Sequence, residues 1–365
     1  MARPHAAALV EDALNRKVNG FLQTRRGWTC RAIGYPGYGG ASFARILGRV
    51  LLSRQDDDEE STTTEDPAAR EARINASATL RERAEERVRG WRAFMTAQAM
   101  DHQVTITLNG RSFEARTDRS GYVDTVVMDH GLPPGRHEAT IRPKDGRPAV
   151  APIEIIAESV RFGVVSDIDD TVMITSLPRP LIAAWNTFVR HEQARHIVPG
   201  MAPMYRELLR EHEGAPMFYL STGAWNTCGT LTRFLKRHGY PAGPLLLTDW
   251  GPTNTGWFRS GQDHKRTSLH RLAREFPHIQ WVLVGDDGQH DPKIYGDFAH
   301  DRPDVVRAIG IRELTPAEQV LSHGIPVSNE GFAPKVHREV PVVRAPDGYG
   351  LLPKLQAVLG GHEVL

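Results

Sequence analysis

The chain has 365 residues, enough for two domains of average size, each with a core of its own. It carries 45 basic and 44 acidic residues, so its formal net charge is +1. No field of one sign spans the molecule to attract a polyanion, and this argues against a nucleic-acid partner. Cys30 and Cys228 are far apart in the chain and stand in no metal-like spacing. We therefore expect two reduced thiols, with neither a disulfide framework nor a zinc site.

The first 54 residues are basic, with nine Lys or Arg against Glu11 and Asp12. Apolar residues recur at helical spacing within 10–22 and predict an amphipathic helix, which packs on a domain or lies on a membrane surface. Charged residues interrupt this segment, and no apolar run reaches the roughly 18 residues that a membrane-spanning helix needs. The expectation is a cytoplasmic protein, with peripheral membrane contact as the alternative role of the helix.

The next 50 residues change character several times. Gly34–Gly40 is rich in glycine and predicts turns, and a strand is expected to follow from Phe43 to Leu52. An acidic run within 55–67 predicts a disordered loop, because like charges repel one another and bury no apolar surface. A second amphipathic helix is expected over 78–100.

From residue 104 the apolar period changes from 3.6 to 2. Short alternating stretches, separated by turn signals such as Asn109-Gly110, cover 104–108, 112–115, 122–126, 137–141 and 152–156. This pattern indicates an antiparallel β-sandwich and completes an N-terminal domain of helical and β-sandwich character over 1–160. No catalytic constellation is visible in it, so the expected role is packing, targeting or regulation, with a partner that the sequence does not identify.

A third pattern begins at Arg161, where short apolar strands alternate with amphipathic helices. This alternation predicts a parallel sheet covered by helices on both faces. The strands are expected at 162–166, 217–220, 245–247, 281–284 and 305–309. The corresponding domain spans 161–315, and the proline-rich residues 316–365 are expected to form an irregular extension that ends in a short helix near 351–359.

Two carboxylates directly follow the first of these strands. In an open parallel sheet, reactive groups gather beyond the carboxyl ends of the strands. Asp167 and Asp169 could therefore share a pocket, one attacking phosphorus while the other protonates the leaving oxygen. Crowded carboxylates repel each other, so the pair needs a cation. Taken alone, the segment could equally be an acidic turn.

Three further elements follow in order. Ser221 ends a strand and could donate to a phosphoryl oxygen, although Ser221 or Thr222 could instead cap the next helix. Lys265 could neutralise a transferring phosphoryl group, although a single lysine is more often a surface charge. Asp286 ends an apolar strand and Asp291 follows five residues later, which suits an oxygen-ligated Mg²⁺. Three of the four elements end a predicted strand, and this favours one catalytic site over separate coincidences.

The set resembles the four motifs of the haloacid dehalogenase superfamily. The chain is further similar to the actin-patch phosphatidate phosphatase family, a relative of the lipins, through Gly34–Gly39, Gly48–Leu51, Ser166–Thr171 and Gly285–Tyr295. The resemblance is strong from Arg161 to about Leu314. It implies an α/β fold, namely a Rossmann-like three-layer haloacid dehalogenase catalytic domain with a minimal cap, preceded by the N-terminal antiparallel β-sandwich.

The resemblance also implies roles for single residues. Asp167 is expected to be the nucleophile and Asp169 the general acid and later the base. Ser221 and Lys265 are expected to stabilise the phosphoryl group, and Thr171 to contact the substrate. Positioning and charge neutralisation would then do most of the catalytic work.

A magnesium ion is the implied cofactor. Asp286 is expected to hold it together with Asp167 and the backbone carbonyl of Asp169, while Asp291 orients the metal waters or the lysine. The segment after Ser221 lacks the proline that the family usually has before its Trp, so Thr222 stays an alternative phosphoryl contact.

Three functions follow as hypotheses. The segments between the motifs, 176–200 and 223–264, leave no room for a large folded cap, and an open site suits a large or membrane-held substrate. The first hypothesis, which the resemblance implies and an open site suits, is a Mg²⁺-dependent phosphatidate phosphatase that releases diacylglycerol and phosphate through an aspartyl-phosphate intermediate. The alternatives are a phosphatase of a soluble phosphomonoester and a phospho-ligand binding module without turnover.

Overall fold

The computed structural model describes residues 28–54, 99–174, 196–248, 261–288, 290–315, 318 and 340–360. These residues divide between two compact units. Unit 1 comprises Met1–Gly37, Arg45–His130 and His137–Ile153, and unit 2 comprises Tyr38–Ala44, Gly131–Arg136 and Glu154–Leu365. The expected N-terminal helix, the acidic loop at 55–67 and nearly all of the helix expected over 78–100 lie outside the described residues.

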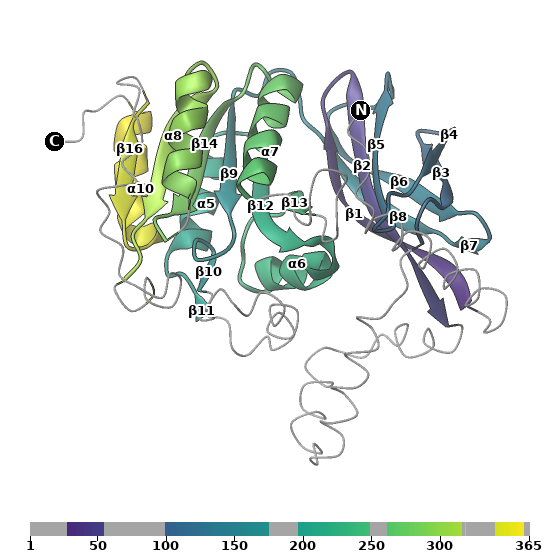
Figure 1. The fold of residues 1–365 in the computed structure, drawn as a ribbon. Coiled ribbons are helices and arrows are strands. Elements are labelled where there is room, and N and C mark those ends of the chain that lie inside the picture. Colours follow the sequence, from purple (N-terminus) through teal and green to yellow (C-terminus); the bar gives the residue numbers. More distant parts are fainter. Residues whose placement is uncertain are drawn as a thin grey trace, which may run out of the picture. The chain divides into compact units, whose positions relative to one another are not determined.

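The strands of the N-terminal half join in one eight-stranded sheet (Figure 1). They are β1 (Trp28–Gly39), β2 (Phe43–Arg54), β3 (Gln103–Leu108), β4 (Arg111–Arg116), β5 (Tyr122–Met128), β6 (Gly135–Pro143), β7 (Gly146–Arg147) and β8 (Ala149–Ile155). Their order is β4-β3-β6-β8-β1-β2-β5, with β7 beside β1. The expected strand at 43–52 and the five short strands expected between 104 and 156 are all present.

The sequence predicts two sheets packed face to face, whereas these strands form a single sheet in which β4 also contacts β5, the strand at the other end of the order. Alternating burial is clear in β3, where Val104, Ile106 and Leu108 are buried. Such alternation records which face of a strand is inside. It does not record whether the hydrogen-bonded ladder is interrupted, which distinguishes two sheets from one.

The glycine-rich segment Gly34–Gly40 is part of strand β1 as far as Gly39, so the prediction of turns there is wrong. A Cβ added at Gly34 would lie 2.1 Å from the carbonyl oxygen of Val150 in β8. Glycine is therefore needed because a neighbouring backbone approaches closely, and composition alone does not distinguish this use of glycine from a turn.

Unit 2 is built on a six-stranded sheet in which all neighbouring strands are parallel. The order is β13 (Leu245–Thr248), β12 (Met217–Ala224), β9 (Phe162–Asp167), β14 (Gln280–Asp286), β15 (Val306–Arg312) and β16 (Val342–Ala345). The first five are the predicted strands. Strand β16 was not expected, because it lies within the segment 316–365 that was taken as irregular.

The helices of unit 2 flank this sheet (Figure 1). They are α5 (Met201–Arg210), α6 (Cys228–Arg237), α7 (Gly261–Glu275), α8 (Asp291–Asp301) and α10 (Gly348–Leu359), with a 3₁₀ turn η4 (Trp225–Thr227) before α6 and a small antiparallel pair of β10 (Met173–Ile174) with β11 (His196–Ile197). The helix expected near 351–359 is α10. Helix α7 packs beside α8 and α5 beside α10. The chain passes from β9 through β12 to β13 toward one edge of the sheet and then returns to β14 on the other side of β9. Because such crossovers are right-handed, α5 and α7 lie on opposite faces of the sheet.

Within the described residues, no helix combines the length and the apolar character that a membrane span requires. Cys30 and Cys228 are both buried and both reduced, as expected. Burial raises the pKa of Cys228 to about 12, so this thiol is unreactive at neutral pH.

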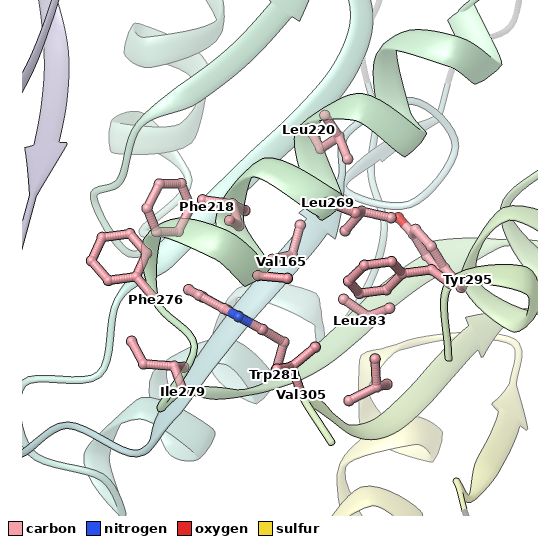
Figure 2. Close-up of a cluster of buried hydrophobic side chains, with 14 of the residues drawn as sticks. Val165, Phe218, Leu220, Leu269, Phe276, Ile279, Trp281, Leu283, Tyr295 and Val305 are labelled. Carbon is pink, nitrogen blue, oxygen red and sulfur yellow. The ribbon is translucent and has the colours of Figure 1, made fainter. Parts of the chain in front are cut away.

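The core of unit 2 is a cluster of buried apolar side chains from β9, β12, β14, α7 and α8 (Figure 2). Phe218 and Trp281 meet edge to face, with ring centroids 5.6 Å apart. Tyr38 also belongs to the cluster: its ring lies 4.9 Å from that of Phe218 and its hydroxyl donates to Glu275 at 2.8 Å. Residues 38–44, which comprise the end of β1, the turn after it and the start of β2, thus contribute to the core of unit 2 although the parallel sheet of this unit begins only at Phe162.

Candidate active site

The predicted carboxylates and the lysine meet at the carboxyl edge of the parallel sheet in unit 2. Asp167 is the last residue of β9, and Asp286 is the last residue of the adjacent strand β14. Asp291 begins α8, and Lys265 lies near the start of α7. All four side chains are buried. A Cβ at Gly285 would lie 2.6 Å from Oδ2 of Asp291, so glycine before Asp286 makes room for the second carboxylate.

Lys265 forms two buried ion pairs. Its Nζ lies 2.6 Å from Oδ1 of Asp167 and 2.5 Å from Oδ1 of Asp291. Burial alone would lower the pKa of Lys265, but the neighbouring carboxylates, Asp167 foremost, outweigh burial and raise this pKa. The lysine therefore keeps its charge inside the site, and it is not the exposed surface charge that a single lysine more often represents.

Negative charge still exceeds positive charge in this cluster. Oxygens from Asp167, Asp286 and Asp291 lie within 4.8 Å of one another. Oδ2 of each of these residues is buried without a hydrogen-bond partner among the described residues. Burial, followed by repulsion from Asp291, raises the pKa of Asp286, and burial also raises the pKa of Asp167 despite the nearby lysine. Buried carboxylates of this kind need a counter-charge, and three converging oxygens suit a hard divalent cation.

Asp169 and Ser221 form a second contact at the same edge. The Ser221 hydroxyl donates to Oδ2 of Asp169 at 2.9 Å and accepts from the backbone N–H of Gly223 at 2.9 Å. Burial raises the pKa of Asp169 to about 6, although the hydrogen bond from Ser221 opposes this shift. A carboxyl group that titrates near neutrality can give a proton and take one back. Thr222 makes a different contact, because its carbonyl accepts from the Thr248 hydroxyl at 2.8 Å.

The loop after Asp167 is tightly wound. Two backbone N–H groups, those of Val172 and Met173, donate to the carbonyl of Ile168, and the N–H of Asp170 donates to the carbonyl of Met173. Asp170 has a φ of 58°. The Thr171 hydroxyl is buried without a hydrogen-bond partner among the described residues, so it is available to a substrate oxygen, the role expected of Thr171.

Two residues that hold this loop were not anticipated from the sequence. Arg312, the last residue of β15, is buried and donates to the carbonyl of Asp170 at 2.6 Å. Tyr240 donates its hydroxyl to the carbonyl of Val172 at 2.9 Å. The predicted strand ended at residue 309, which left Arg312 beyond it. The apolar pattern continues for two more residues, and that signal would have placed Arg312 at the carboxyl edge. No local pattern singles out Tyr240.

Residues 162–313 match the family model described as the catalytic domain of phosphatidate phosphatase APP1, and all eight predicted site residues lie in this segment. The chain is 27% identical over 171 residues to phosphatidate phosphatase APP1 of Saccharomyces cerevisiae, a match that covers 46% of this chain and 29% of that protein. It is 26% identical over 162 residues to an uncharacterized protein of Schizosaccharomyces pombe, covering 42% and 25%, respectively. The chain thus spans less than a third of the length of these curated relatives.

Among solved structures, a carbohydrate acetylesterase from Xanthomonas citri aligns with 90% of this chain and 74% of its own, at a TM-score of 0.25 and 8% identity. These values are too low to indicate a shared fold.

Proposed function

We propose that this chain, in which residues 162–313 form a catalytic domain of the APP1 phosphatidate phosphatase type, is a Mg²⁺-dependent phosphatase that converts phosphatidate to diacylglycerol and phosphate at the cytoplasmic face of a membrane. The main support for this function is the buried set of carboxylates around Lys265 at the carboxyl edge of a parallel sheet. The order of the site residues along the chain also supports a haloacid dehalogenase-type catalytic domain, and the short segments between its motifs support a minimal cap.

The proposed reaction has two steps. A carboxylate oxygen of Asp167 attacks phosphorus, the bond from phosphorus to the glycerol oxygen breaks, and Asp169 gives its proton to that oxygen. Asp169 then takes a proton from the water that attacks the aspartyl phosphate, and phosphate leaves as Asp167 is restored. Oδ2 of Asp167 has no hydrogen-bond partner among the described residues, so it is free to attack while Oδ1 is held by Lys265.

The remaining side chains would stabilise the phosphoryl group. Lys265 brings a buried positive charge, and the hydroxyls of Ser221 and Thr171 are possible donors to phosphoryl oxygens. The Ser221 hydroxyl donates to Asp169, so the same group that orients the acid is placed to contact the substrate in turn. Thr222 lies beside Ser221 and stays a proposed substrate contact.

The carboxylates fit Mg²⁺ because three of their oxygens converge and one lysine faces three carboxylates, so negative charge exceeds positive charge in the cluster. Asp167, Asp286 and Asp291 would hold the ion, and the backbone carbonyl of Asp169 is a further proposed ligand. The Asp169 side chain is outside the converging set. Bound there, Mg²⁺ would neutralise charge on the transferring phosphoryl group.

Phosphate release tests this function. We would compare phosphatidate in mixed micelles with a panel of soluble phosphomonoesters, with Mg²⁺ and with EDTA, using Asp167→Asn as the blank. A preference for phosphatidate that EDTA and the blank both remove is the expected result. Turnover of soluble esters alone would identify the substrate as a soluble phosphomonoester. Mg²⁺-dependent ligand binding without turnover would identify the chain as a binding module.

Two exposed side chains, one apolar and one aromatic, lie near the loop that follows Asp167 and support a lipid substrate. Ile197 in β11 is 43% exposed, and its Cα pairs with that of Met173 at the end of this loop. Tyr349, in the first turn of α10, is 66% exposed, and a Cβ at Gly200 would lie 2.7 Å from its Cγ. Apolar and aromatic side chains placed beside a reactive edge suit contact with a membrane interface.

We therefore expect Ile197→Asp with Tyr349→Asp to raise the KM for phosphatidate in vesicles by roughly tenfold, because loss of one buried apolar side chain costs about 1.5 kcal/mol or more. Turnover of a soluble ester should stay unchanged. Val150→Asp is the matched control, since Val150 is 52% exposed but lies in unit 1. Equal losses on lipid and soluble substrates would show that these side chains serve the fold instead.

A further inference from the structure

The guanidinium of Arg312 joins three separate segments of unit 2. The residue is 4% exposed. Its Nη1 donates to the carbonyl of Asp170 at 2.6 Å, its Nε to the carbonyl of Pro346 at 3.1 Å, and its Nη2 to Oε1 of Glu318 at 2.6 Å. A guanidinium presents its donors in a rigid planar fork, so the three acceptors are held at fixed angles to one another.

The backbone of Arg312 is fixed beside the cluster of carboxylates. Its Cα pairs with that of Asp286 in β14 and, on the other side, β16 pairs with it through Ala345. Its carbonyl accepts from the N–H of Asp287 at 3.0 Å. The side chain therefore starts from a rigid strand end, next to Asp286, and reaches the loop that carries Asp169.

The Asp170 carbonyl is an effective point at which to hold that loop. Asp170 stands between Asp169 and Thr171, and its φ of 58° costs a non-glycine residue roughly 1 kcal/mol. A hydrogen bond from a charged donor is stronger than one from a neutral donor, so Arg312 offsets this strain and fixes the peptide that leads to Thr171. Tyr240 secures the same loop two residues later through the Val172 carbonyl.

Two of the three acceptors of the Arg312 guanidinium, Glu318 and Pro346, lie outside residues 162–313, the segment that matches the family model. The Glu318 carboxylate also accepts from the N–H of Thr315 at 2.8 Å and from the Thr315 hydroxyl at 3.0 Å. Pro346 directly follows strand β16 and precedes α10. The contacts that hold Arg312 in place are thus supplied by residues that belong to the C-terminal part of unit 2.

We propose that Arg312 is a positioning residue, which acts through the Asp170 carbonyl to hold Asp169 and Thr171 in their working orientation and makes that orientation depend on Glu318 and Pro346. The inference rests on the proposed phosphatase function. Its distinguishing consequence concerns the leaving group. A misplaced Asp169 impairs protonation of an alkoxide, whereas an aryl oxide such as p-nitrophenolate leaves with little need of a proton.

The test compares Arg312→Lys with wild type on an alkyl phosphomonoester and on p-nitrophenyl phosphate, in the full chain with Mg²⁺. Lysine keeps the charge but lacks the fork. We expect kcat/KM, which reports the step in which the leaving group departs, to fall about tenfold more for the alkyl ester than for the aryl ester, since general acid catalysis contributes on the order of 100-fold or more. Arg307→Lys is the matched control, because Arg307 lies on the same strand and donates to the Leu359 carbonyl at 3.1 Å, away from the site.

Equal losses on both esters would overturn the positioning role, since a general loss of folded protein lowers both rates alike. If Arg312→Lys does not fold, Glu318→Gln replaces it: this change weakens one arm of the fork and leaves the Asp170 contact, so a smaller shift of the same sign is expected and no shift overturns the proposal. Absence of turnover of any ester by the wild-type chain would instead refute the proposed function.

Discussion

Asp167→Asn is expected to reduce phosphate release by on the order of 10,000-fold or more, because the amide cannot form an acyl phosphate and the nucleophile is lost altogether. The change conserves shape. Asp167 is buried at the end of β9, and its environment raises the pKa of its carboxyl group, so this position already disfavours the charge that the variant removes.

The folded state should survive this substitution. Lys265 keeps its second ion pair, with Asp291 at 2.5 Å, and repulsion within the cluster decreases. We therefore expect the Tm of Asp167→Asn in Mg²⁺-free buffer to equal or exceed that of the wild type. Rates would be measured with the best substrate from the comparison of lipid and soluble esters, and Tm by circular dichroism.

Asp301→Asn is the matched control, because it makes the same chemical change at an exposed residue at the end of α8. It should retain the full rate. A residual rate for Asp167→Asn within tenfold of the wild type, in folded protein, would place the nucleophile elsewhere and rule out the proposed mechanism.

Lys265→Met is expected to damage both catalysis and stability. Loss of a preorganised charge at the phosphoryl group should lower kcat by on the order of 100-fold or more. In Mg²⁺-free buffer the variant leaves Asp167, Asp286 and Asp291 buried together without a positive charge in their cluster. Removing one partner of a buried ion pair typically costs about 3–5 kcal/mol, so the free energy of unfolding should fall by that amount.

Added Mg²⁺ should restore part of this lost stability, because the ion binds the folded state and supplies the missing charge. Urea unfolding with Mg²⁺ and with EDTA measures the effect. We expect the difference between the two conditions to be larger for Lys265→Met than for the wild type. No stabilisation of either protein by Mg²⁺ would contradict the metal site at these carboxylates.

Lys293→Met is the matched control for Lys265→Met, because it removes an exposed ion pair instead of a buried one. Lys293 contacts Asp297 at 2.7 Å, nearly the same distance as in the Lys265 pairs, but its side chain is 55% exposed. Exposed pairs contribute about 1 kcal/mol at most. If the two variants lost equal stability, burial would not be the reason why Lys265 matters.

The sequence predicted those site residues that stand at the carboxyl ends of strands. Asp167 ends a fully buried strand and Asp286 ends a strand that is buried from Trp281 onward, and parallel strands direct their carboxyl ends to one edge. Lys265 was the weakest of the predicted residues, because nothing in its local pattern distinguishes a buried lysine from an exposed one. Its two ion pairs appear only when α7 is packed on the sheet.

The sequence by itself determined where most of the strands lie and which of their faces are buried. It also placed the two Asp pairs and the serine, in their order along the chain, at the carboxyl ends of predicted strands. Periods of 2 and 3.6 and runs of apolar residues carry that information, because each depends on neighbours along the chain.

Only the tertiary structure decided what depends on distant partners. Strand β16 is four residues long and exists because β15 pairs with it, Tyr38 is buried because Phe218 and Glu275 surround it, and Arg312 matters because the carbonyl of Asp170 lies within its reach. Local patterns record that a residue is buried but not what it meets. Contacts between residues more than 100 positions apart, such as Arg312 with Asp170, are therefore determined by packing alone.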